Sequence, residues 1–286
     1  MVGGERVRSP AVAGQFYPMD AGALRQELER CFNDTRLGPG RMPRPRATPP
    51  ERVVGLLAPH AGYRYSGHTA ARAFAALADR GTPGALVLLG PNHHGIGPAL
   101  AVPEATHWAT PIGRVAVDME LADALCRRLP SLARSDAAHA QEHSLEVEVP
   151  FLQHLYGQSL RLLPVAVATV EVGLAVTLGR ALAEVLEGRR AAIVASSDLS
   201  HYLPDAEARR RDRMALEAVA SLDPRQLALV VEQEGVSMCG LGPAMTMMEA
   251  CRALGATRVV ELGYATSADT SGDTTWVVGY GAMLVE

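Results

Sequence analysis

Lysine is absent from the 286 residues of this sequence, and all 27 Lys and Arg positions hold arginine. The absence excludes Schiff-base catalysis, a pyridoxal phosphate anchor and the lysine of a P-loop, because each of them needs a primary amine. A GC-rich coding bias explains the missing lysine without any functional cause, and the chemical exclusion holds for either origin.

Paired cysteines, long apolar runs and excess positive charge are also lacking. The four cysteines are far apart and form no Cys-x-x-Cys motif, so we expect a reducing, cytoplasmic environment. No apolar stretch is long enough to span a membrane, and the first residues lack the apolar segment of a signal peptide. A net charge of -4 gives no electrostatic case for nucleic acid as a partner.

Short apolar runs alternate with helical patterns along the chain. We predict strands over 53–58, 85–90, 162–168, 191–196, 258–264 and 275–285. We predict helices over 20–31, 67–79, 118–129, 144–156, 172–186, 205–220, 224–233 and 242–254. This alternation is typical of an α/β three-layer sandwich, in which a central, largely parallel or mixed sheet carries helices on both faces. We expect a single domain over 1–286, with an exposed loop rich in Pro, Gly and Arg over 38–50.

Two of the predicted strands end in proline and then histidine. The run 53–58 leads into Pro59 and His60, and the run 85–89 leads into Gly-Pro-Asn followed by His93 and His94. Open α/β sheets build their sites at the carboxyl ends of strands, so these imidazoles indicate a metal site. Adjacent side chains diverge in an extended segment, so we expect only one of His93 and His94 to face a shared site. The other would orient it or bind substrate.

A third strand, 191–196, leads into Asp198 and His201. Residues three apart share one face of a helical turn, and a carboxylate beside an imidazole suits a general base or a partner that orients a ligand. An equally simple interpretation is that Ser197 or Asp198 caps a short turn, and the two interpretations are compatible.

Glu142-His143 and Cys239 complete the set of reactive residues between core elements. Cys239 lies in a Gly-rich loop before a predicted helix, where we expect a depressed pKa that suits thiolate ligation, although a lone free cysteine is more often a small buried apolar residue. A structural zinc site is disfavoured because no paired-Cys motif exists, and a serine triad is disfavoured because no Gly-x-Ser-x-Gly motif occurs. Together these residues indicate a metal site.

Six motifs in this sequence resemble the Memo family, whose prokaryotic members are called AmmeMemoRadiSam system protein B. They are AVAGQFYP (11–18), APHAGYRYSG (58–67), LGPNHHG (89–95), EHSLEVEVPFLQ (142–153), SSDLSHY (196–202) and CGLGP (239–243). The resemblance spans nearly the whole chain. It implies the fold of LigB-type class III extradiol dioxygenases, which use non-haem iron.

The same resemblance implies roles for individual residues. The positions that match the metal-binding residues of Memo are His60, His94 and Cys239. Asp198 and His201 match further pocket residues, with His201 as the acid or base and Asp198 orienting it. The side chains expected to line the pocket are His93, His143 and Tyr63. The family name also implies partner proteins of the radical-SAM and AMMECR types.

One departure from the dioxygenases concerns the third metal ligand. Their iron is held by two histidines and a carboxylate, whereas a thiolate occupies the third place here. A softer ligand shifts preference toward copper(I) or changes the redox behaviour of iron, and a shared fold does not carry an activity with it. We therefore expect iron(II) or copper in a dioxygenase-like oxidoreductase acting on a small aromatic or other small molecule. The alternatives are a non-catalytic module that binds a metal, peptide or partner, and a hydrolytic metal site.

Overall fold

The computed structural model describes residues 4–286 and has the α/β architecture predicted from the alternating pattern. Its strands are β1 (Val7–Arg8), β2 (Val54–Ala58), β3 (Ala85–Pro91), β4 (Leu100–Val102), β5 (His107–Thr110), β6 (Gly113–Val117), β7 (Ala133–Arg134), β8 (Arg161–Val167), β9 (Ala191–Ser196), β10 (His201–Leu203), β11 (Val259–Thr266) and β12 (Val277–Val285). Its α-helices are α1 (Ala21–Asn33), α2 (Tyr63–Arg80), α3 (Met119–Arg128), α4 (Ala137–Ala140), α5 (Val149–Tyr156), α6 (Val172–Leu186), α7 (Asp205–Ala220), α8 (Pro224–Glu234), α9 (Leu241–Ala253) and α10 (Ala268–Ser271). Two 3₁₀ turns, η1 (Glu146–Glu148) and η2 (Gly157–Ser159), flank α5.

The strands of the described chain form one mixed sheet in the order β1-β5-β6-β8-β3-β9-β2-β12-β10, with β11 also paired to β12 and β4 to β8. At its centre β8, β3, β9 and β2 are parallel, whereas β12 runs antiparallel to β2. The carboxyl ends of β3, β9 and β2 therefore lie next to one another at one edge of the sheet. That edge is where open α/β sheets place their sites.

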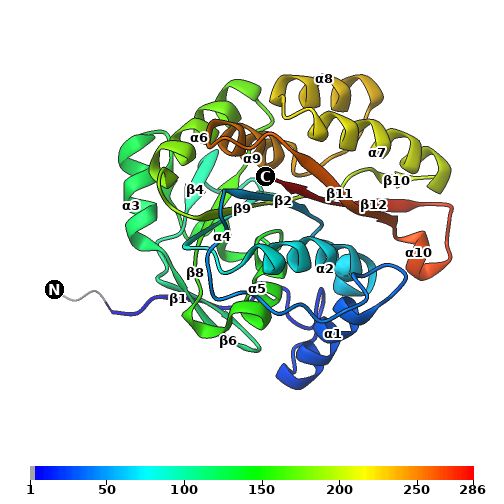
Figure 1. Cartoon of the computed structure of the whole chain (residues 1–286), viewed down its shortest axis with the longest axis horizontal. Helices are drawn as coiled ribbons and strands as arrows, with labels where there is room; N and C mark the ends of the chain where they lie inside the picture. The colour runs from blue at the N-terminus through cyan, green and yellow to red at the C-terminus, as the bar shows by residue number, and fades with distance from the viewer. Residues whose placement is uncertain (1–3) are drawn as a thin grey trace.

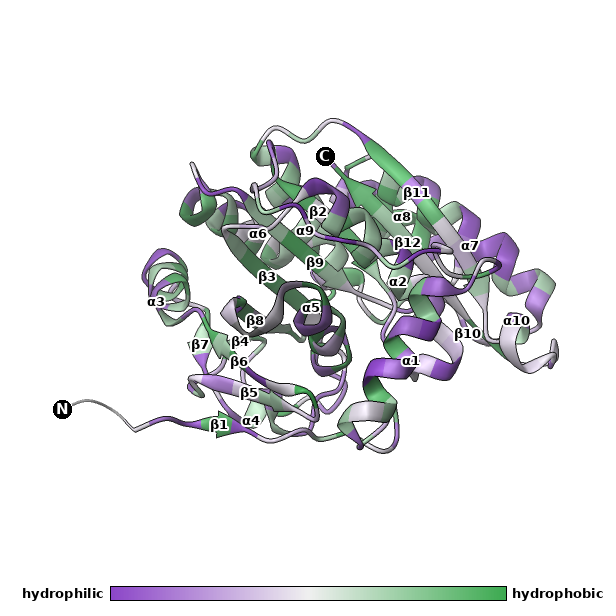
Figure 2. Cartoon of the chain, turned by 60° about the horizontal axis from the view of Figure 1, so that its bottom comes forward, coloured by the Kyte–Doolittle hydropathy of each residue, from purple (hydrophilic) through white to green (hydrophobic). Residues whose placement is uncertain are grey.

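Helices cover both faces of the sheet, as Figure 1 shows. Helices α1, α2 and α5 lie on one face, and α3, α6, α7, α8 and α9 lie on the other. Because side chains alternate along a strand, Leu56 of β2 belongs to the core under the first group and Leu57 to the core under the second. Figure 2 shows the central strands as hydrophobic, with hydrophilic residues on the outer faces of α1 and α7.

The structure confirms the longer predicted elements and adds short ones. Each of the six predicted strands overlaps β2, β3, β8, β9, β11 or β12, and each of the eight predicted helices overlaps an observed one. Pro150 begins α5 within its first turn, where its missing N–H costs no helical hydrogen bond, so the predicted helix over 144–156 opens as η1. Residues 38–50 form no helix or strand and most of them are exposed. Among residues 4–286, no helix has both the length and the apolarity that crossing a membrane requires.

Candidate metal centre

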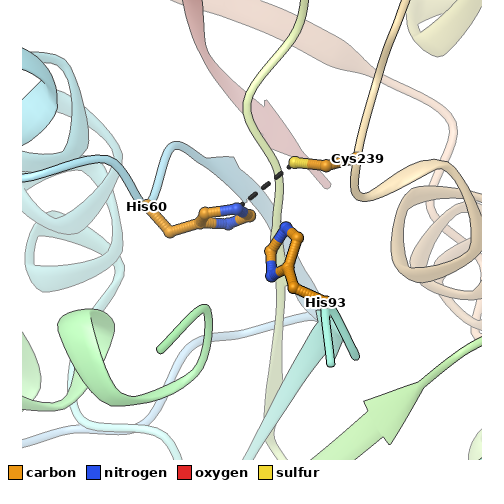
Figure 3. Close-up of side chains that lie close together, drawn as sticks. All are labelled: His60, His93 and Cys239. Carbon is orange, nitrogen blue, oxygen red and sulfur yellow. Dashed lines mark hydrogen bonds between the residues drawn. The ribbon is translucent and has the colours of Figure 1, made fainter. Parts of the chain in front are cut away.

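Three side chains from distant parts of the chain converge at the carboxyl edge of the sheet. His60 lies two residues beyond β2, His93 two residues beyond β3, and Cys239 just before α9. One ligand atom from each lies within 4.8 Å of the others, and Figure 3 shows the side chains pointing toward one another. His60 and Cys239 are 179 positions apart in sequence, so only the fold brings them together.

His60 is held on three sides. Its backbone N–H donates to Asp198 Oδ1 (2.9 Å), its Nδ1 lies 2.8 Å from Ser196 Oγ, and its Nε2 lies 3.2 Å from Cys239 Sγ. The ring is buried, and burial lowers the pKa of His60 well below its usual value. The imidazole is therefore neutral, and one nitrogen of a neutral imidazole carries a lone pair that can bind a metal.

The carboxylate of Glu142 fixes the orientation of His93. Glu142 accepts the backbone N–H of His93 (2.6 Å) and lies 2.9 Å from its Nδ1. Burial acts to raise the pKa of Glu142, but hydrogen bonds from His93 and from the Ser144 backbone outweigh it and hold the pKa below its usual range. An ionised Glu142 only accepts, so it requires the proton of His93 on Nδ1 and leaves the Nε2 lone pair free.

His143 stacks on His93 and faces the same carboxylate. The two ring centroids lie 4.6 Å apart, and His143 Nδ1 lies 3.4 Å from Glu142 Oε1. His93, Glu142 and His143 form a second group with metal-binding spacing. Glu142 already accepts hydrogen bonds from the backbone N–H and the ring Nδ1 of His93 and from the Ser144 backbone, so we assign it to orienting His93. Burial lowers the pKa of His143 to about 4, which keeps this stacked ring neutral.

Cys239 supplies the sulfur of the group. Its Sγ accepts the backbone N–H of Asp198 at 3.2 Å. The expected depression of the Cys239 pKa is wrong: burial raises the pKa of this thiol, and the Asp198 carboxylate raises it further. The sulfur therefore keeps its proton until a cation compensates the thiolate. One sulfur and two imidazole nitrogens with oriented lone pairs fit a soft or borderline metal ion.

Asp198 and His201 do not form the pair that a helical turn would make. Residues 197–200 form no helical turn between β9 and β10, and Asp198 turns its buried carboxylate to the backbone of His60. Burial raises the pKa of Asp198 to about 7. Ser237 orients His201 instead, because its hydroxyl accepts the His201 backbone N–H (2.7 Å) and its carbonyl oxygen lies 3.0 Å from His201 Nδ1.

His201 retains the chemical character expected of a base. A carbonyl oxygen only accepts, so the contact with Ser237 places the proton on Nδ1 and leaves Nε2 as an acceptor. Burial lowers the pKa of His201, and a positive charge on His93 would lower it further.

Two residues predicted for the site lie elsewhere. His94 is exposed and its Nε2 lies 3.1 Å from the carbonyl oxygen of Gln141, outside the group formed by His60, His93 and Cys239. The structure therefore brings His93, in place of the predicted His94, together with His60 and Cys239. Tyr63 does not line a pocket: its buried ring packs on Phe151 (4.9 Å), and its hydroxyl donates to the Val147 carbonyl oxygen.

The N-terminal segment contributes a part of the site that sequence reasoning missed. Phe16 packs its ring on His143, with centroids 4.6 Å apart. Buried Glu146 anchors this segment, accepting hydrogen bonds from the Tyr17 hydroxyl and the backbone of Val12, and pairing with Arg8. The motif over 11–18 could have signalled this contact, because its two aromatic residues lie outside every predicted helix and strand.

Comparison with known proteins gives one consistent family. A family model described as "Memo-like protein" matches residues 8–284. A MEMO1 family protein of Methanopyrus kandleri is 44% identical over 279 residues, which cover 97% of this chain and 98% of the relative. A second, from Ignicoccus hospitalis, is 43% identical with the same coverage. The crystal structure of an uncharacterized protein from Escherichia coli K12 shares the fold, with a TM-score of 0.56 at 14% identity over 81% of this chain and 99% of that one.

Proposed function

The chain belongs to the Memo-like family, and we propose that it binds one iron(II) or copper ion through His60, His93 and Cys239 and uses it in redox chemistry on a small molecule. The observation that carries this proposal is the convergence of two imidazole nitrogens and one sulfur within 4.8 Å. The motifs over 58–67, 89–95 and 239–243, which suggested the family, are the ones that supply these three residues.

The donor set limits which metal is suitable. A thiolate and two imidazoles suit iron or copper, whereas magnesium and calcium prefer oxygen ligands. A bound iron or copper ion would supply electron transfer and open positions for a small molecule. The protein's part is to fix the ligands before binding: Glu142 orients His93, Ser196 contacts His60 Nδ1, and the Asp198 backbone N–H contacts the sulfur.

His201 is the residue we assign to proton transfer. The Ser237 carbonyl oxygen accepts a hydrogen bond from His201 Nδ1–H, so the Nε2 of the neutral ring carries no proton. This nitrogen can therefore accept a proton from a substrate hydroxyl. The lowered pKa keeps it unprotonated, and therefore available as a base, at neutral pH. Asp198 is assigned to holding the His60 backbone rather than to orienting His201.

Metal analysis of anaerobically purified protein tests the binding step. Protein loaded with iron(II), and separately with copper(I), is expected to retain one equivalent after desalting. Cys239→Ala is expected to lose that metal, whereas the matched control Cys126→Ala, a half-buried cysteine outside the group, is expected to keep it. Equal metal content in the wild type and Cys239→Ala would contradict the proposed ligand set.

Oxygen uptake then separates an enzyme from a binding module. The metal-loaded protein is expected to consume oxygen with at least one member of a panel of catechols and aminophenols, and His201→Ala to abolish that uptake without loss of metal. Metal retention with no oxygen uptake would leave a non-catalytic metal-binding module.

Association with radical-SAM and AMMECR-type proteins is a further proposal, carried by the family resemblance.

A further inference from the structure

A buried carboxyl group lies one hydroxyl away from His60. Glu148, at the end of η1, is 1% exposed, and its Oε1 lies 2.8 Å from Ser196 Oγ. Its Oε2 has no hydrogen-bond partner. In the described chain no arginine or histidine pairs with this carboxyl group, although an ionised carboxylate buried without a cation or several donors is strongly destabilising.

Three polar groups surround the single hydroxyl hydrogen of Ser196. Its Oγ lies 2.8 Å from His60 Nδ1, 2.7 Å from the Ser144 carbonyl oxygen and 2.8 Å from Glu148 Oε1. The carbonyl oxygen can only accept, so it takes the hydroxyl hydrogen. His60 and Glu148 must then both donate to the lone pairs of Ser196 Oγ. An ionised Glu148 would instead claim that hydrogen and leave two oxygen atoms in contact at 2.7 Å without a proton between them.

We propose that Glu148 is a neutral carboxylic acid at neutral pH and acts as a positioning residue for His60 through Ser196. With Glu148 donating and Ser144 accepting, the one remaining lone pair of Ser196 Oγ faces His60 Nδ1 and holds the imidazole proton there. The Nε2 lone pair of His60 is thereby directed at Cys239 and the metal-binding group. In a neutral acid the unpartnered Oε2 is a carbonyl oxygen. Burying it costs much less free energy than burying a charged oxygen.

The surroundings of Glu148 favour its neutral form. Burial raises the pKa of Glu148 well above its usual value, the hydrogen bond with Ser196 opposes this rise, and the Asp198 carboxylate adds to it. Other titratable groups near Glu148 are His60, on the far side of the Ser196 hydroxyl, and the buried phenol of Tyr63, whose own pKa is raised by burial and by Glu148. This inference deepens the proposed function, because it explains how a ligand of the proposed site is held ready.

The tautomer of His60 in metal-free protein is the first measurement. Nitrogen-15 NMR of histidine-labelled protein is expected to show His60 with its proton on Nδ1 in the wild type and in Glu148→Gln, whose amide N–H replaces the acid O–H as donor. Glu148→Leu removes the donor that holds the Ser196 hydroxyl in place, so the hydroxyl can turn its hydrogen from the Ser144 carbonyl oxygen to His60 Nδ1, and a detectable Nε2–H population is expected. If Gln behaves like Leu, or if all three proteins share one tautomer, the proposal is overturned. This readout needs no metal, so it is independent of the proposed metal binding.

Infrared spectroscopy provides a second measurement that does not depend on the Leu variant folding. The wild type at neutral pH is expected to show the C=O stretch of a protonated glutamic acid, identified by carbon-13 glutamate labelling, and Glu148→Gln is expected to lose it. Iron(II) affinity should change less than about twofold in Glu148→Gln and fall about 10–100-fold in Glu148→Leu, the range for residues that orient metal ligands. Absence of the acid band in the wild type would overturn the proposal.

Discussion

The two ends of the central strands are built from different kinds of polar chemistry. At the amino end of β2 a cavity of about 520 Å³ is lined by charged residues, among them Arg46, Arg52, Arg80 and Glu286. Its ion pairs, such as Arg80 with Glu286, are partly or largely exposed. At the carboxyl end, His60, Glu142, Glu146 and Glu148 are each 2% exposed or less.

The cavity at the amino end of β2 therefore does not mark the candidate metal site, which lies at the opposite end of the strands. At the amino end, solvent screens the charges, and the pKa of Glu286 is lowered by its hydrogen bond with Arg80. At the carboxyl end, burial makes an unpaired polar group costly, and the specific partners of His60, Glu142 and Glu146 fix their tautomers and protonation states. Groups arranged in that way mark functional sites more reliably than an open, charged depression does.

The largest expected effect comes from the two adjacent histidines. His93→Ala is expected to abolish retention of iron(II) or copper(I), because it removes one of three ligands and leaves Glu142 without its main donor. His94→Ala serves as the matched control and is expected to retain one equivalent, because this exposed ring lies outside the group and its Nε2 faces the Gln141 carbonyl oxygen. Metal analysis after desalting measures the metal content of both variants. Loss of metal in His94→Ala alone would show that His94 is the ligand, as the family resemblance implies.

Breaking the buried ion pair beside the site should cost the most folding stability. In Glu146→Ala, Arg8 stays buried without its carboxylate, and the Tyr17 hydroxyl loses its acceptor. We expect the free energy of unfolding to fall by about 3–5 kcal/mol, as for other buried pairs that lose one partner. Denaturant unfolding measures the change, and a loss below about 1 kcal/mol would show that this pair behaves like a surface pair.

Acid should destabilise the same region through His139. Burial first, and the positive charge of Arg8 second, lower the pKa of His139 to about 4, against about 6.5 in an unfolded chain. Between pH 6.5 and 4 the unfolded chain binds a proton that the native chain does not, so stability falls as pH falls, by up to about 1.4 kcal/mol per pH unit. His139→Leu should make the pH dependence of unfolding shallower over this window. An unchanged slope would rule out His139 as its source.

The smallest effect is expected at the amino end of the strands. Glu286→Gln weakens contacts with Arg80 and Arg258, whose side chains are 32% and 67% exposed. Exposed pairs contribute about 0–1 kcal/mol, and added salt reduces that contribution further. Denaturant unfolding at low and high salt is the measurement, and a larger, salt-independent loss would remove the contrast between the two ends.

The fold could be predicted where the signal lies within single elements. Apolar runs bounded by Gly and Pro located β2, β3 and β9, and parallel pairing of such strands brings their carboxyl ends, and with them His60 and His93, to one edge. Cys239 precedes α9, and the family resemblance assigned it to the same site. The short strands β1, β4, β7 and β10 have two or three residues each, too few to show a period. They depend on pairing with distant strands, which no local pattern encodes.

The choice between His93 and His94 could not be made from the sequence because the chain turns there. The Gly95 backbone N–H contacts the Asn92 carbonyl oxygen, and Gly95 has φ +62°, so the two histidines are the central residues of a turn. Which one faces inward is then decided by Glu142, 49 positions away, through its hydrogen bond with the His93 backbone. Likewise, Asp198 contacts His60 rather than His201 because the segment after β9 is not helical.

The order of the proposed ligands along the chain bears on when the proposed metal can bind. His60 and His93 are synthesised early, whereas Cys239 follows His60 by 179 positions. At about 5–20 residues per second, the ribosome adds that sulfur roughly ten to forty seconds later. A nascent chain therefore holds only the two imidazoles of the site for most of its synthesis. Metal loading then becomes a late step in biogenesis, restricted to chains that are nearly complete.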